Sequence, residues 1–278
     1  MIELPEVATI ADQMRREYRG KAIQAVSIAE DRPKFMFLNA DPAAYEARLV
    51  RHRIVDVVGN GKWIFATLDS GAILLLGEMF GRFLHVLPDE PLPRKAHAIV
   101  TFEDGGRLVL TIQAWGAFQV VTRDELDVHP HAGKQGISPL DNAFTPERFG
   151  EILDGSGGWS RKPIKAFLVH EGNVCGIGNG YLQDILYRAK LSPKRKVPGI
   201  APDERERLRR AIAATMKEAV GKGGRDTEKD LYGRPGAYVP ILDQRADGRP
   251  CPGCGAPIQK ISYLGGSCYV CPSCQSVG

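Results

Sequence analysis

Four cysteines in two close pairs near the C-terminus are the feature that most restricts the fold. Cys251 and Cys254 form one C-x2-C pair, Cys271 and Cys274 form the other, and sixteen residues separate the pairs. Each pair presents two thiolates to one ion, and two such pairs on a β-hairpin complete a tetrahedral Zn²⁺ site. Sulfur fills all four positions, so none is left for a catalytic water. We therefore predict one structural zinc ion that stabilises a hairpin too small to fold unaided.

The two remaining cysteines, Cys175 and Cys268, are interpreted as ordinary buried thiols. Cys268 is an alternative zinc ligand, but it lies outside the two C-P-x-C pairs. The N-terminus lacks a basic-then-apolar signal pattern, and no apolar run approaches the roughly 20 residues that span a bilayer. We expect a cytoplasmic protein without a membrane partner, in which clustered cysteines favour metal over disulfides.

The charge is distributed unevenly along the chain. Residues 1–154 hold 17 Lys and Arg against 22 Asp and Glu, a net −5, whereas residues 155–278 hold 20 against 11, a net +9. A basic half joined to an acidic half indicates a polyanionic partner for the basic half. Solvated helix faces are the alternative explanation of the same charges.

The hydrophobic pattern changes once along the chain. An amphipathic helix, "ELPEVATIADQMRREYRG", is followed by short alternating runs typical of antiparallel strands, with one helix, "DPAAYEARLV", among them. After about residue 125 the pattern is helical, and a Gly- and Pro-rich stretch then leads to the cysteines. We predict an α+β protein. Its parts are an N-terminal antiparallel β-sandwich with flanking helices (residues 1–125), a helical domain (126–235) and a zinc-finger β-hairpin (236–278).

Four shorter motifs carry candidate site residues. In "VCGIGNGYLQDILY" a glycine-rich turn opens a helix at Asn179, so we expect the first backbone N–H groups of the helix to be able to face an anion, and "KPIK" adds Lys165. In "GNGKWIFATL" Lys62 stands at the mouth of a strand, and in "GEMFGRFL" Met79 lies on a short turn. The alternatives are a plain tight turn for the glycines, a solvated lysine for Lys62 and a core methionine for Met79.

Taken together, these motifs resemble the formamidopyrimidine-DNA glycosylase/endonuclease VIII family of base excision repair. The resemblance covers the whole chain in order: "ELPEV", "NGKWIF", "GEMFG", "GIGNGY" and the terminal "C-P-x-C…C-P-x-C". It implies that the helical domain has a helix–two-turns–helix core. It also implies double-stranded DNA with a lesion or abasic site as the partner, and extrusion of the target nucleotide from the duplex.

The resemblance also implies residue roles. An amine attacks C1′ of the sugar and forms a Schiff base, while Glu3 acts as acid/base at the sugar. Lys62, Lys165 and Asn179 contact phosphates around the lesion, and Met79 fills the gap in the stack.

Three positions depart from the family pattern. Ile2 stands where the family carries a proline whose amine is the nucleophile, and a bulky second residue normally blocks removal of Met1. The candidate amine is then that of Met1, one residue further from Glu3, or that of Lys62. "TIQAWGAF" lacks the arginine that faces the orphaned base, although Trp115 is a candidate wedge. Gly266 takes the place of an arginine in the finger.

The sequence therefore predicts a DNA glycosylase/AP lyase with a weakened or altered nucleophile, monomeric, cytoplasmic and associated with the nucleoid. One alternative is a non-catalytic relative that binds lesions and has lost the reaction. The other is a zinc-finger protein that binds RNA or another protein.

Overall fold

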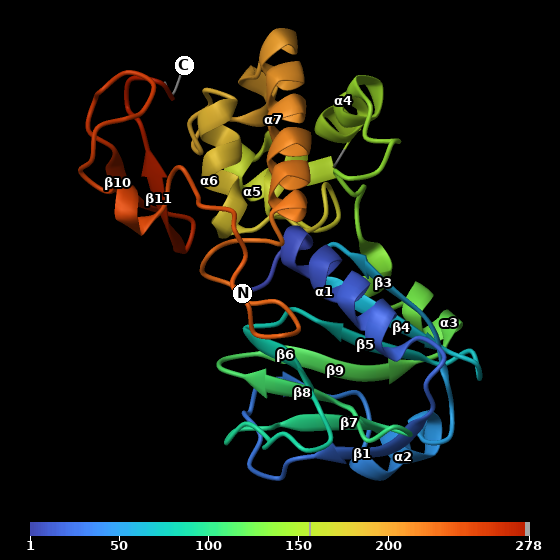
Figure 1. Ribbon diagram of the computed structural model, residues 1–278. Coiled ribbons are helices and arrows are strands. Elements are labelled where there is room, and N and C mark those ends of the chain that lie inside the picture. Colours follow the sequence, from blue (N-terminus) through green and yellow to red (C-terminus); the bar gives the residue numbers. More distant parts are fainter. Residues whose placement is uncertain (156, 276–278) are drawn as a thin grey trace. The chain divides into compact units, whose positions relative to one another are not determined.

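The computed structural model describes residues 1–155 and 157–275, and the chain divides into two compact units (Figure 1). Unit 1 comprises Met1–Lys134 and Lys222–Ala237, and unit 2 comprises Gln135–Gly221 and Tyr238–Gly278. The sequence analysis grouped residues 222–235 with the helical domain, whereas they pack within unit 1. The limits of the functional domains stay a prediction.

Unit 1 is built on a β-sandwich. Within the described residues, a five-stranded sheet has the order β2-β9-β5-β4-β3 and a four-stranded sheet the order β1-β7-β8-β6. All neighbours are antiparallel except β2 and β9, which are parallel. One apolar core draws buried side chains from both sheets. The strands are β1 (Ile23–Ile28), β2 (Met36–Phe37), β3 (Ile54–Asn60), β4 (Trp63–Leu68), β5 (Ile73–Gly77), β6 (Gly81–Val86), β7 (Ala98–Phe102), β8 (Arg107–Ile112) and β9 (Gly116–Val121).

Helix α1 (Leu4–Tyr18) begins unit 1 and covers part of its core (Figure 1). Pro5 lies in its first turn, where a missing N–H costs no intrahelical bond. The backbone N–H of Glu3 donates to the Glu6 carboxylate at 2.8 Å, which satisfies a donor at the helix start. Val7, Ile10 and Met14 share the buried face that the sequence pattern predicts. The other helices of unit 1 are α2 (Pro42–Leu49), α3 (Arg123–Asp127) and the 3₁₀ turn η1 (Ala132–Lys134).

The segment Lys222–Ala237 packs against α1. Gln13 donates to the Asp230 carboxylate at 2.9 Å and accepts from the backbone N–H of Leu231 at 2.9 Å. Gly236 lies so close to Gly224 that an added Cβ would sit 2.1 Å from the Gly224 carbonyl oxygen. Only glycine fits at position 236, where the backbone passes close to the turn at Gly224 that precedes Arg225.

Unit 2 is helical with a small hairpin at its C-terminal end. Its main core collects buried side chains from the helices, and a separate small core includes Leu242, Ile258 and Tyr269 under the hairpin. The helices are α4 (Pro146–Gly155), η2 (Gly157–Arg161), α5 (Ile164–Leu168), α6 (Asn179–Arg188), η3 (Val197–Gly199), α7 (Pro202–Gly221) and η4 (Gln244–Ala246), and the antiparallel hairpin is β10 (Gln259–Tyr263) with β11 (Gly266–Val270).

The prediction of an α+β fold with a sandwich, a helical part and a cysteine-bearing hairpin is confirmed. Among the described residues, no helix combines the length and apolar character needed to cross a bilayer.

Candidate functional site

The α-amine of Met1 occupies a defined position in unit 1. It lies 3.0 Å from Oε1 of Glu228, and the Met1 side chain is 25% exposed. The backbone N–H of Ile2 donates to the Met79 carbonyl at 3.1 Å, and the Ile2 side chain is buried in the sandwich core. Ile2 therefore anchors the terminus, and a carboxylate holds the amine.

Arg225 joins the acidic residues around this amine. Its guanidinium donates to the Met1 carbonyl at 2.8 Å and lies 3.3 Å from Glu6, 3.5 Å from Glu228 and 3.7 Å from Glu3. Its backbone N–H donates to Glu6 at 2.9 Å. Glu3 is only 2% exposed, and a buried carboxylate needs such a cation because its desolvation is otherwise unfavourable.

The sequence analysis assigned no role to Arg225 or Glu228. The available signal was the pair of glycines before Arg225. Gly224 has φ +91°, and an added Cβ would sit 2.8 Å from Cγ of Glu6. A glycine turn of this kind lets one backbone approach another closely, but the partner it approaches is more than 200 residues away.

The remaining candidates in unit 1 lie around the β4–β5 hairpin. Lys62 is buried directly before β4, and its carbonyl accepts from the backbone N–H of Glu78 at 3.2 Å. Met79 is fully buried, and an added Cβ on Gly116 would sit 2.9 Å from its sulfur. Met79 thus occupies a core position in this structure, so insertion into DNA would require its side chain to leave the core.

Trp115 differs from Met79 because it faces solvent. Its side chain is 39% exposed, and its ring centroid lies 5.2 Å from that of Phe80. The Trp115 carbonyl accepts from the backbone N–H of Phe80 at 2.8 Å. Trp115, the wedge candidate, therefore contacts Phe80 and still exposes part of its side chain to solvent.

In unit 2, Lys165 and Asn179 meet at the turn of the cysteine hairpin. Nζ of Lys165 donates to the Tyr263 carbonyl at 2.7 Å and to Sγ of Cys268 at 3.3 Å. A Cβ added to Gly266 would lie 2.9 Å from Nδ2 of Asn179 and 3.5 Å from Nζ of Lys165. Both polar groups therefore reach the backbone of Gly266, although Lys165 itself is only 2% exposed.

The four paired cysteines converge at the end of unit 2. Their Sγ atoms lie within 4.8 Å of one another, with 3.9 Å between Cys251 and Cys274 and 3.4 Å between Cys254 and Cys271. Tetrahedral zinc with Zn–S bonds of about 2.3 Å requires sulfurs roughly 3.8 Å apart, so this donor set fits the ion. Cys268 lies outside the group and accepts from Lys165 instead.

Hydrogen bonds lower the pKa of the Cys251 thiol. Its burial acts to raise the pKa, but hydrogen bonds from the Tyr187 hydroxyl at 3.3 Å and the Gly253 backbone N–H at 3.4 Å lower the pKa to about 6. A thiolate is the form that binds metal.

Comparisons with known proteins agree with this architecture. The model of the formamidopyrimidine-DNA glycosylase N-terminal domain matches residues 1–113, and that of the formamidopyrimidine-DNA glycosylase H2TH domain matches residues 135–230. Formamidopyrimidine-DNA glycosylase of Geobacillus kaustophilus is 32% identical over 99% of this chain and 100% of its own length. Its counterpart from Symbiobacterium thermophilum is 30% identical over 100% of this chain and 90% of its own length.

Solved structures share the fold. The crystal structure of the MutM (Fpg) protein from Thermus thermophilus matches with a TM-score of 0.82 at 28% identity, covering 99% of both chains. A structure of MutM in complex with carbocyclic 8-oxo-G containing DNA matches with a TM-score of 0.86 at 23% identity, again over 99% of both chains. The chain belongs to the formamidopyrimidine-DNA glycosylase family. The family resemblance read from the sequence is confirmed.

Proposed function

We propose that this protein is a DNA glycosylase/AP lyase of base excision repair that uses the α-amine of Met1 as its nucleophile. Family membership supports the glycosylase activity. The ion pair between the Met1 amine and Glu228 at 3.0 Å carries the assignment of the amine. The substrate class is double-stranded DNA with a damaged base, formamidopyrimidines included, or an abasic site.

The amine must lose a proton before it attacks, and Glu228 is the carboxylate within hydrogen-bond distance to accept it. The neutral amine then bonds to C1′ of the sugar while the bond from C1′ to the base breaks, and the base leaves with the electron pair. Glu3 donates a proton to the sugar ring oxygen as the C1′–O4′ bond breaks, and the attacking nitrogen loses a proton, so that a C1′=N Schiff base forms. Loss of a proton from C2′ of the resulting Schiff base eliminates the 3′ phosphate and cleaves the strand.

Binding to DNA rests on further residues. Lys62, Lys165 and Asn179 contact phosphates near the target nucleotide, and Met79 and Trp115 are the wedge residues. The net charge of +9 over residues 155–278 supports a phosphate-binding role for that half.

One Zn²⁺ ion bound by Cys251, Cys254, Cys271 and Cys274 stabilises the β10–β11 hairpin and takes no part in the chemistry. We further propose that the protein acts as a monomer in the bacterial cytoplasm, on the nucleoid.

Trapping of the Schiff base tests the assignment of the amine. Borohydride reduces a Schiff base between an amine and an abasic sugar to a stable adduct, and peptide mapping identifies the amine. Mild transamination with pyridoxal phosphate converts an α-amine to a ketone and leaves lysines intact. We expect native protein to form an adduct at Met1, the transaminated protein to form none, and Lys62→Met to retain adduct formation.

The outcomes separate the alternatives. Loss of trapping in Lys62→Met alone would assign the nucleophile to the lysine. Absence of adduct in every form, with abasic duplex still bound more tightly than intact duplex, would show a non-catalytic protein. Ile2→Pro lets Met1 be removed and places a proline amine directly before Glu3, which should raise trapping at least tenfold, about 1.4 kcal/mol of barrier.

A further inference from the structure

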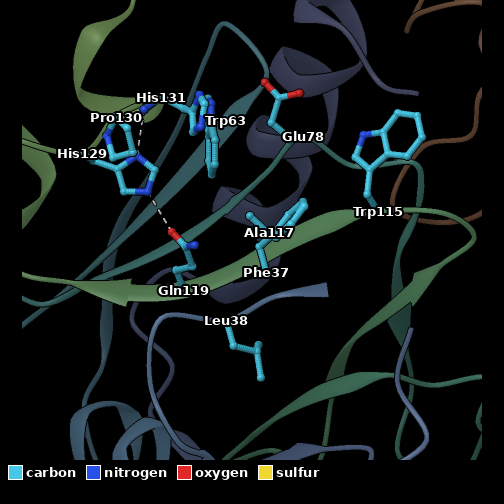
Figure 2. A pocket seen from close by; sticks show the side chains of 10 residues that line it. All are labelled: Phe37, Leu38, Trp63, Glu78, Trp115, Ala117, Gln119, His129, Pro130 and His131. Atoms are coloured by element: carbon cyan, nitrogen blue, oxygen red, sulfur yellow. Dashed lines mark hydrogen bonds between the residues drawn. The ribbon is translucent and has the colours of Figure 1, made fainter. Parts of the chain in front are cut away.

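A pocket in unit 1 lies beside Trp115 and Glu78. Its volume is about 510 Å³, within the range of pockets that hold small ligands. In Figure 2, Trp115 stands on one side of the pocket, and Trp63 stands on the opposite side with His129 and His131. Phe37, which is 47% exposed, lines it as well. Exposed aromatic side chains around a concave site mark a binding surface.

The polar groups of the pocket have fixed orientations. Nδ1 of His129 accepts from the backbone N–H of Ala132 at 2.9 Å and of His131 at 3.3 Å. Its proton is therefore on Nε2, which donates to Oε1 of Gln119 at 2.9 Å (Figure 2). Burial lowers the pKa of His129 below its ordinary value, and His131 acts in the same direction.

This chain of hydrogen bonds determines what Gln119 offers a ligand. Because the amide oxygen of Gln119 accepts from His129, its NH₂ group remains as a donor, and it has no hydrogen-bond partner in the part of the chain that the structure describes. Glu78 contributes a carboxylate acceptor from a backbone with φ +45°, a conformation rare for residues other than glycine. The pocket thus combines aromatic walls with one donor and one acceptor.

These features select the class of ligand. No lysine or arginine is among the lining residues and Glu78 is acidic, so the lining disfavours a phosphate. Aromatic walls bind a flat ring, and an amide with a carboxylate matches the mixed donor and acceptor edge of a nucleobase. The site is therefore suited to an uncharged base.

We propose that this pocket receives the nucleobase that loses its partner when the target nucleotide leaves the duplex. The inference rests on the proposed function, because Trp115 is both the wedge candidate and a wall of the pocket. The two residues before Trp115 are Gln113 and Ala114, so neither offers a cation, whereas the pocket offers the Gln119 amide and the Glu78 carboxylate.

Photocrosslinking tests this proposal on the full-length protein. The probe is a duplex with a tetrahydrofuran abasic analogue opposite 5-iododeoxyuridine, whose photoproduct bonds to nearby aromatic rings. With native protein at saturation, we expect adducts at Phe37, Trp63 or His129, identified by peptide mapping. Adducts confined to Trp115, or to residues outside the pocket, would overturn the proposal.

A matched pair of variants tests the amide. Gln119→Leu removes the donor and should lower the crosslink yield at least fivefold, which corresponds to the free energy of roughly one hydrogen bond. Gln24→Leu makes the same change on the exposed face of β1 and should keep the native yield. An unchanged yield in Gln119→Leu would overturn the role of the amide. Fluorescence anisotropy distinguishes failure of the pocket proposal from failure of the proposed function. Equal affinity of the native protein for abasic and intact duplex would contradict the proposed function itself.

Discussion

At the scale of single residues, the N-terminus combines an apolar anchor with an ionic cluster. The side chain of Ile2 is buried in the sandwich core, which explains why a bulky residue is accommodated at this position. Met1 is thereby directed to Glu228, and Arg225 binds the Met1 carbonyl and three carboxylates. The geometry around the amine is thus maintained by residues far along the chain.

Arg225→Met should strongly destabilise unit 1. The substitution removes the cation from between the carboxylates of Glu3, Glu6 and Glu228, and breaking a buried ion pair from one side costs about 3–5 kcal/mol. Urea denaturation followed by circular dichroism measures the free energy of unfolding. Arg19→Met, at an exposed position after α1, is the control and should change it by less than about 0.5 kcal/mol. Equal stability of the two variants would contradict a structural role for the cluster.

At the scale of elements, the β10–β11 hairpin depends on groups outside its own strands. The strands pair over five residues each, and a two-stranded hairpin of this size is marginally stable in water. Gln183 of α6 accepts from the backbone N–H of Tyr269, and Lys165 donates to the Tyr263 carbonyl. Contacts from α5 and α6 therefore help to define the position of the hairpin.

Zinc removal should unfold the hairpin and leave unit 1 intact. Purified protein should contain one zinc per chain by elemental analysis. Cys251→Ser should lose the metal and expose the segment around residues 251–274 to protease, because a folded structural site depends on its ion. Cys268→Ser is the matched control and should retain one zinc, since Lys165 contacts this sulfur. Loss of zinc in Cys268→Ser as well would mean that the ligand set is assigned incorrectly.

Helix α7 carries an ion-pair group with a defined pH response. The hydrogen bonds from Arg209 and Arg210 lower the pKa of Glu206 to about 2. A carboxylate whose pKa is lower in the folded state stabilises the protein above its unfolded pKa, near 4.5, and loses this contribution as pH falls toward 2. Glu206→Gln should lower the free energy of unfolding by about 1 kcal/mol at pH 7, a value reduced for solvent screening.

Urea titrations at pH 7 and pH 3 measure this difference, which should be smaller at pH 3. Glu151→Gln, which affects an exposed pair with Arg148, is the control and should change stability by less than about 0.5 kcal/mol. A difference for Glu206→Gln that stays constant between the two pH values would contradict the assignment of the ion pair.

At the scale of the whole molecule, the sequence predicted the architecture better than the site. Alternating apolar runs and one helical pattern were enough to predict the sandwich. Burial of one face of a strand or helix dictates the spacing of its apolar residues along the sequence. Cysteine spacing sufficed for the four-sulfur cluster. The partners of Met1 were missed because contacts between residues 227 positions apart leave no local periodicity. The alignment of His129 with Gln119 likewise depends on tertiary packing, whereas a core position for Met79 was one of the two interpretations of its motif.

The basic half of the chain should make DNA binding depend on salt. Lys165→Ala should weaken binding to abasic and intact duplexes alike and reduce the slope of log K against log salt by about 0.9, one phosphate contact. Anisotropy titrations over a range of salt concentrations measure the slope. Lys217→Ala, at an exposed position of α7, is the control and should keep the native slope. Weaker binding with an unchanged slope in Lys165→Ala would mean that Lys165 acts only through the hairpin.

The return of Lys222–Ala237 to unit 1 sets an order of events during synthesis. Arg225 and Glu228 emerge from the ribosome more than 200 residues after Met1, and after most of the helices that the structure describes in unit 2. At a bacterial rate of about 5–20 residues per second, the terminus spends roughly ten seconds or more without these partners. During that interval Met1 is open to processing enzymes, and the identity of residue 2 decides the outcome. Under the proposed function, processing of the nascent chain therefore decides which amine is presented to DNA, before Arg225 and Glu228 have emerged.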